Sequence, residues 1–152
     1  MKTEPLPMQI AAEIEAAAES IVLSAMCLEA YINGFAQDHL AQQWTQDTER
    51  VEAPVKWLII PAMLGKRDCF TKGSQPYQDF MMLIRWRNEL AHYKHEFYAP
   101  VQLDKKKQET IVNVSRIYSF CNASNAKKGL ETVRKMVGKI NECLGFSIPR
   151  WV

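Results

Sequence analysis

The chain has 152 residues, 47% of them hydrophobic, which is enough to bury one core without disulfides. A formal net charge of only +2 excludes nucleic-acid binding driven by overall basicity. The four cysteines are widely spaced with no C-x-x-C pair and predict reduced core thiols. The longest apolar run, Trp57 to Leu64, is too short to cross a membrane, and no signal-peptide pattern opens the chain. We expect one cytoplasmic domain over residues 1–152 and no membrane partner.

Residues from about Met8 to about Leu40 are predicted to form a long helix, because apolar residues recur there at alternating steps of three and four. Residues 47–55 are predicted to be a linker or a frayed turn. A short helix from Pro54 to Leu64 follows, broken or kinked at Pro61, since proline removes a backbone donor. Residues 65–73, bounded by glycines, are predicted to be loop.

The next predicted helix begins after Ser74-Gln75-Pro76, where a cap-type residue and an early proline precede a run without further proline or glycine. That run extends from Tyr77 to His95, and Pro100 ends its tail.

Two more helices are predicted in the last third of the chain. The first spans about Lys105 to Asn122 and is capped by Asp104. A polar turn over residues 122–125 leads to the second, from about Ala126 to Leu144. No segment shows a strand pattern of useful length, so the predicted fold is an all-α, up-and-down bundle of four to five helices.

The helix over residues 77–95 carries charge inside its apolar face. At about 100° per residue, Arg87 falls within the same arc as its apolar residues and should point toward the packed side. A buried guanidinium requires a carboxylate, carbonyl groups or a bound anion. Arg85, Asn88 and His92 form a second stripe along one flank. Two interpretations stay open, a structural arginine that bridges helices and a site that binds phosphate.

The six residues Arg87-Asn88-Glu89-Leu90-Ala91-His92 resemble the motif of HEPN domains, in which an arginine is followed by a histidine after four to six residues. Residues 23–33 resemble the first long helix of that family, including an acidic residue that faces the motif. Residues 55–61 and 64–66 resemble its connecting segment. These blocks follow the order and approximate spacing of the family.

The resemblance implies metal-independent RNA cleavage, in which a ribose 2′-hydroxyl attacks the adjacent phosphate and leaves a 2′,3′-cyclic phosphate. By this resemblance His92 is the general acid or base, Arg87 stabilises the phosphorane, and Asn88 orients His92 or the phosphate. Imidazole suits proton transfer near neutral pH, and a guanidinium suits concentrated negative charge. We expect no cofactor and no metal, because H-x-x-H-E over residues 92–96 is not a zinc-protease order.

The positions of Arg87 and His92 around the helix bear on how the predicted site is assembled. Arg87 and His92 are about 140° apart on an ideal helix, so one straight helix does not direct both at one phosphate. The resemblance implies a homodimer in which motif helices of two chains face one cleft. Arg85 is the alternative arginine because it is nearly in line with His92. Glu29 is expected either to hold the arginine or histidine of the motif or to be a solvated helix carboxylate.

Substrate contacts are expected from Lys94 and His95, which follow the motif. Three short groups of basic residues have two possible interpretations: further contacts with RNA or a nucleotide phosphate, or solvated helix ends and loops. They are Lys66-Arg67, Lys105-Lys106-Lys107 and Lys127-Lys128. Some ribonucleases of the HEPN family have a tyrosine two residues after the motif histidine. This sequence differs from them, because the residue two positions after His92 is Lys94.

Two functions follow from the resemblance. The first is a dimeric endoribonuclease, a toxin or phage-defence effector held in check by a nucleotidyltransferase-type antitoxin. The second is a non-catalytic helical module that dimerises or binds a nucleotide or RNA, because a shared fold does not establish activity.

Overall fold

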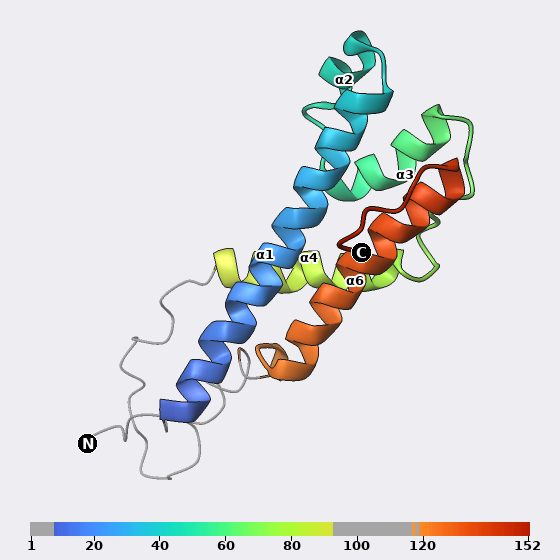
Figure 1. Ribbon diagram of the computed structural model, residues 1–152. Coiled ribbons are helices and arrows are strands. Elements are labelled where there is room, and N and C mark those ends of the chain that lie inside the picture. Colours follow the sequence, from blue (N-terminus) through green and yellow to red (C-terminus); the bar gives the residue numbers. More distant parts are fainter. Residues whose placement is uncertain (1–7, 93–116, 118) are drawn as a thin grey trace.

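The computed structural model describes residues 8–92, 117 and 119–152 (Figure 1). Within these residues it contains helices and no strand, which confirms the predicted all-α bundle. The five helices described are α1 (Met8–His39), α2 (Gln42–Thr48), α3 (Ala53–Met63), α4 (Tyr77–Ala91) and α6 (Ala123–Leu144). None of them combines the length and the apolar character that crossing a bilayer requires.

Helix α1 is the centre of the bundle and packs against each of the other four helices. It lies beside α6, and the two run in the same direction, as Figure 1 shows. The Ser20 hydroxyl donates to the carbonyl of Ala126, and farther along the Asn141 amide donates to the Tyr31 hydroxyl. Helix α4 crosses both (Figure 1), so its two ends reach different surfaces of the molecule.

The core follows from the apolar spacing of α1. Ile21, Leu28 and Ile32 are fully buried, and they recur at steps that place them on one side of the helix. They meet large side chains of the other helices, among them Trp57 of α3 and Phe80 of α4. Burying each such side chain contributes about 1.5–3 kcal/mol. The resulting packing holds α4 rigidly across α1.

Helix α4 ends earlier than predicted. Its last residue is Ala91, and His92 occupies the C-cap with φ −101° and ψ 16°, outside the helical range. The His92 amide still donates to the carbonyl of Asn88 at 2.9 Å. The predicted continuation of the helix through His92 is therefore wrong. Residues 93–95, including Lys94 and His95, lie outside the described residues.

Helix α6 begins three residues before the predicted start. Asn122 is its N-cap, and the Asn122 side chain accepts a hydrogen bond from the backbone amide of Asn125 at 2.9 Å. The polar residues predicted to form a turn are therefore a capped first turn of helix, because asparagine satisfies an amide that lacks a helical partner. Gly145 ends the helix in the left-handed region at φ 74°, as the sequence predicts. Of the preceding predicted helix, residues 105–116 and residue 118 lie outside the described residues.

Helix α2 was not predicted at all. Its sequence is almost entirely polar, so it carries no apolar stripe to indicate a helix. The Thr45 hydroxyl donates to the carbonyl of Ala36 at 3.3 Å and joins α2 to the end of α1. Helix α3 starts near its expected position, with Pro54 in the first turn, and continues past Pro61 to Met63. Of the two predicted alternatives at Pro61, a break or a kink, the break is absent.

Candidate functional site

Arg87 lies in the second half of α4, where that helix crosses α1. Its side chain is 31% exposed, and Nη2 is 3.9 Å from Oε2 of Glu29 in α1. That distance permits an ion pair and is too long for a hydrogen bond. Arg87 Nε is buried without a hydrogen-bond partner among the described residues. The guanidinium therefore retains unused donor capacity at the edge of the packed face.

Glu29 restrains Arg87 only loosely. Its own side chain is 47% exposed, so solvent screens the pair, and exposed ion pairs contribute about 0–1 kcal/mol. Each partner belongs to a different helix, and both helices are held by the core. The structure thus places Glu29 beside the motif arginine, which was one of the two alternatives expected for it, and it leaves both side chains partly exposed.

The other polar residues predicted for this site on α4 are more exposed than Arg87. Arg85, Asn88 and His92 are all on the surface of the chain. The backbone bond from His92 to Asn88 places these two residues one turn apart at the end of α4. No hydrogen bond joins the side chains of His92 and Arg87 in the part of the chain that the structure describes. The contacts within a single chain therefore do not join the arginine directly to the histidine.

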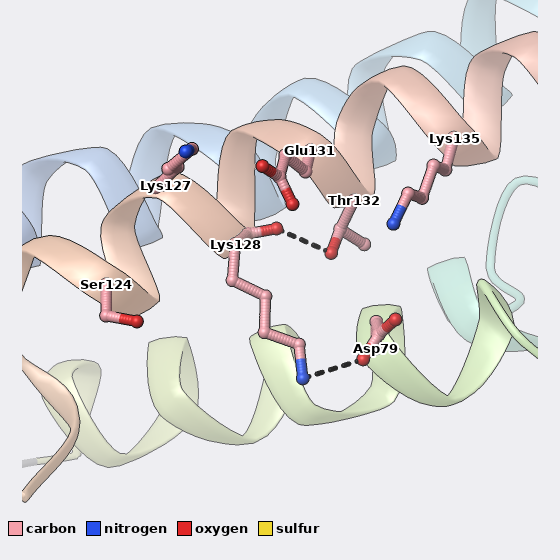
Figure 2. Close-up of a pocket in the computed structure, with 7 residues that line it drawn as sticks. All are labelled: Asp79, Ser124, Lys127, Lys128, Glu131, Thr132 and Lys135. Carbon is pink, nitrogen blue, oxygen red and sulfur yellow. Dashed lines mark hydrogen bonds and ion pairs between the residues drawn. The ribbon is translucent and has the colours of Figure 1, made fainter.

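A polar pocket of about 290 Å³ lies between α4 and α6 (Figure 2). Lys127, Lys128 and Lys135 line it, so the predicted basic pair gains a third lysine from the next turns of α6. Lys128 Nζ reaches Oδ1 of Asp79 in α4 at 2.9 Å. That ion pair neutralises one lysine and ties the two helices together. The other two remain exposed and extend the positive surface along α6.

The remaining predicted basic groups differ from this pocket. Lys66 and Arg67 are exposed in the loop after α3, and the three lysines at 105–107 lie outside the described residues. Asp79 was not predicted as a partner of the lysines, because its pairing depends on how α4 crosses α6.

The two buried cysteines, Cys69 and Cys121, are poor nucleophiles. Burial, together with the neighbouring Cys143 thiol, raises the pKa of Cys69 to about 12. Burial also raises the pKa of Cys121. Both thiols stay protonated at neutral pH, and the thiol form reacts slowly. Cys27 is exposed, so the prediction that all four cysteines are core residues is wrong for this one.

Lys56 is a buried cation that the sequence analysis did not propose as a site residue. It occupies one face of α3 together with Ala53, Trp57 and Ile60, all buried. The sequence alone indicates that Lys56 is on the buried face, because it lies three or four residues from apolar residues and interrupts their stripe. The same argument identified Arg87, and it applies equally to Lys56.

No three His, Cys, Asp or Glu side chains gather as metal ligands within the described residues. Comparisons of the chain with protein-family models, with curated proteins and with solved structures find no match. A functional interpretation therefore depends on the motif residues and on the geometry around them.

Proposed function

We propose that this protein is a metal-independent endoribonuclease of the HEPN type that acts as a homodimer. The observation that carries the proposal is Arg87, a half-buried guanidinium whose buried Nε has no hydrogen-bond partner among the described residues and whose carboxylate partner is 3.9 Å away. An arginine in that state favours an additional anion, and a phosphate matches its fork of donors. The motif that contains it ends in the exposed His92.

In the proposed reaction the ribose 2′-oxygen forms a bond to phosphorus while the bond to the 5′-oxygen breaks. A base removes the 2′-hydroxyl proton, an acid protonates the departing 5′-oxygen, and a 2′,3′-cyclic phosphate remains. His92, which is exposed, provides proton transfer, a role that histidine often takes in general acid–base catalysis. Arg87 stabilises the charge on the phosphorane, and Asn88, one turn from His92, orients the histidine or the phosphate.

The separation of Arg87 and His92 within one chain is the reason for proposing a dimer. A two-fold axis beside α4 would place the exposed end of one motif opposite that of the other, so that each site draws residues from two chains. Arg85 is exposed on the same helix and is the alternative arginine for such a site. The lysines of the α4–α6 pocket would add contacts with the RNA backbone.

A ribonuclease of this kind is toxic to its own cell unless restrained. We therefore propose that the protein acts as a toxin or phage-defence effector and that a nucleotidyltransferase-type antitoxin restrains it.

A non-catalytic module that dimerises or binds a nucleotide or RNA is the second candidate. The Arg87–Glu29 ion pair favours it, because a guanidinium already joined to a carboxylate can serve to hold α4 on α1. In that function His92 would have no proton to transfer, and its replacement would leave ligand binding unchanged.

The test uses purified wild type and the variants Arg87→Ala and His92→Ala, incubated with total RNA and transfer RNA in EDTA. Fragment sizes and the chemistry of the 3′ ends are recorded. Arg50→Ala is the matched control, since Arg50 is exposed in the turn after α2 and outside the motif. Cleavage to cyclic-phosphate ends by wild type and the control alone supports the ribonuclease. A folded wild-type dimer that cuts no RNA would leave the binding module as the function.

A further inference from the structure

Helices α2 and α3 lie near the end of α1, at the end of the bundle away from the α6 N-terminus (Figure 1). A polar cavity is lined there by residues of α1, α2 and α3 and by Glu49. Its volume is about 300 Å³, which is at the lower end of the range for sites that bind small molecules. The lining residues that matter below are Asn33, Gln37, Thr45, Gln46, Glu49 and Lys56. None of them belongs to the HEPN-like motif.

Lys56 supplies a buried positive charge to this cavity. The residue is only 6% exposed. Its ammonium donates to Oδ1 of Asn33 at 2.7 Å and to the backbone carbonyl of Glu49 at 3.2 Å. Both acceptors are neutral, and no carboxylate among the described residues forms an ion pair with it. An ammonium has three donors, so one donor and the full charge remain unmatched.

Such a charge is unfavourable without an anion. Removing an ion from water costs several kcal/mol, and two neutral acceptors recover only part of that. The Glu49 carbonyl follows the last turn of α2, where the helix dipole is negative, and this contributes a further small stabilisation. A bound oxyanion would supply the missing negative charge and accept the third hydrogen bond.

The rest of the lining indicates what else the ligand carries. Because Asn33 Oδ1 accepts from Lys56, its amide nitrogen is available as a donor. Gln37 and Gln46 are exposed and add amide groups, whereas the Thr45 hydroxyl already donates to backbone carbonyls. The Glu49 carboxylate disfavours a second anionic group on the ligand but can accept hydrogen bonds from hydroxyl groups. Among the described residues that line the cavity, Ala36 is the only apolar one.

We propose that this cavity binds a small polyhydroxylated molecule through a single oxyanion, a phosphate monoester or a carboxylate, held by Lys56 and Asn33. The bound molecule would join α1, α2 and α3 through one set of hydrogen bonds. The site is separate from the motif on α4, so the proposal is independent of the proposed function.

The experiment titrates the full-length protein with inorganic phosphate, ribose 5-phosphate or gluconate, each at constant ionic strength balanced with sodium chloride, and measures binding by calorimetry or NMR. We expect saturable binding of at least one hydroxylated probe, with a dissociation constant on the order of 1 mM or tighter. Preference for ribose 5-phosphate identifies the phosphate monoester, and preference for gluconate identifies the carboxylate.

Two variants and one control test whether the probes bind in this cavity. Lys56→Met removes the charge, and Gln37→Glu adds a negative charge at an exposed lining position where folding is not at risk. Each should weaken binding about tenfold or more, since an oxyanion loses a cation or gains a repulsive neighbour. Gln43→Glu, exposed on α2 but outside the cavity, should bind as wild type does.

Absence of saturable binding of all three probes up to about 50 mM would overturn the proposal, because a site that weak has no use in a cell. Equal binding by wild type and Gln37→Glu would overturn it as well, and this variant decides the matter even if Lys56→Met does not fold. Lys56 would then be a structural residue that stabilises the end of α2.

Discussion

Two cations interrupt apolar helix faces in this protein, Arg87 in α4 and Lys56 in α3, and their surroundings differ. Arg87 is half-buried and lies 3.9 Å from a partly exposed carboxylate. Lys56 is buried, and its acceptors are an amide oxygen and a backbone carbonyl. The same sequence pattern therefore indicates a charge that needs a partner, without indicating whether that partner is an acidic side chain or a ligand.

Arginine and lysine differ in how many hydrogen bonds and anions their charged groups can hold at once. A guanidinium is planar, weakly hydrated and offers five donors, so it can keep one carboxylate and still bind a phosphate. An ammonium is a compact point charge that three acceptors saturate. In the two proposals above, Arg87 makes a transient contact with RNA and Lys56 holds an enclosed small ligand. Experiments that treat the two residues differently can separate the assignments.

The largest expected difference is in RNA cleavage. Arg87→Ala should lower the cleavage rate by about 10²- to 10³-fold through loss of charge stabilisation, and His92→Ala by about 10²- to 10⁴-fold through loss of proton transfer. Lys56→Met should cleave as wild type does, because Lys56 is on α3 and its partners are in α1 and the turn after α2. Rates are measured on one labelled transfer RNA. Equal loss of activity in all three would remove the distinction between the two cations.

A large stability effect is expected at the acceptor of the buried lysine. Asn33→Ala leaves the Lys56 ammonium with only the Glu49 carbonyl and should lower the free energy of unfolding by about 1–3 kcal/mol. Urea denaturation followed by circular dichroism measures it. Gln37→Ala, one turn farther along α1, is the control and should change stability little because Gln37 is exposed. An unchanged Asn33→Ala midpoint would show that the bond contributes nothing in solution.

Replacing the lysine itself should change stability less than replacing its acceptor. Lys56→Met keeps the aliphatic stem and removes the buried charge, while the Asn33 and Glu49 oxygens lose a donor. Removal of the buried charge stabilises the fold, whereas loss of the donor to the two oxygens destabilises it. These two effects oppose each other and should leave the free energy of unfolding within about 1 kcal/mol of wild type. The same denaturation series measures it. A loss of about 3 kcal/mol or more would mean that the ammonium is fully satisfied by the protein alone.

The smallest effect is expected at the carboxylate beside Arg87. Glu29→Gln should lower the free energy of unfolding by about 0–1 kcal/mol, since the pair is long and partly exposed. That difference should shrink as sodium chloride is raised, because salt screens exposed charges. Thermal melts of both proteins at low and high salt provide the measurement. A large, salt-independent loss would make Arg87 a structural arginine and favour the binding module.

The helices with strong apolar stripes were predictable, and the one without a stripe was not. Helices α1, α3, α4 and α6 all carry apolar residues at helical spacing, whereas the polar α2 gave no periodic signal. The helix ends were less accurate, because a cap depends on one side chain. Asn122 can start a turn or a helix, and only its bond to the Asn125 amide distinguishes them.

For the candidate site, sequence reasoning selected Arg87 and Glu29 but treated the carboxylate as one of several possible partners. The crossing of α4 over α1 brings the two together. Sequence reasoning also selected Lys127 and Lys128. It missed Asp79, which lies 49 residues before Lys128, because the Lys128–Asp79 ion pair depends on α4 meeting α6. Lys56 was missed although its stripe is visible in the sequence.

The sequence by itself determined that this chain forms an all-α bundle and that two cations sit inside apolar helix faces. Both follow from local spacing, since a residue's place on a helix depends only on its neighbours within a few turns. The tertiary structure alone decided which groups those cations meet. Asn33 and Lys56 are 23 residues apart, and their contact at 2.7 Å exists only because α3 packs on α1. Partner choice is set by helix packing, which the spacing of residues within one helix does not encode.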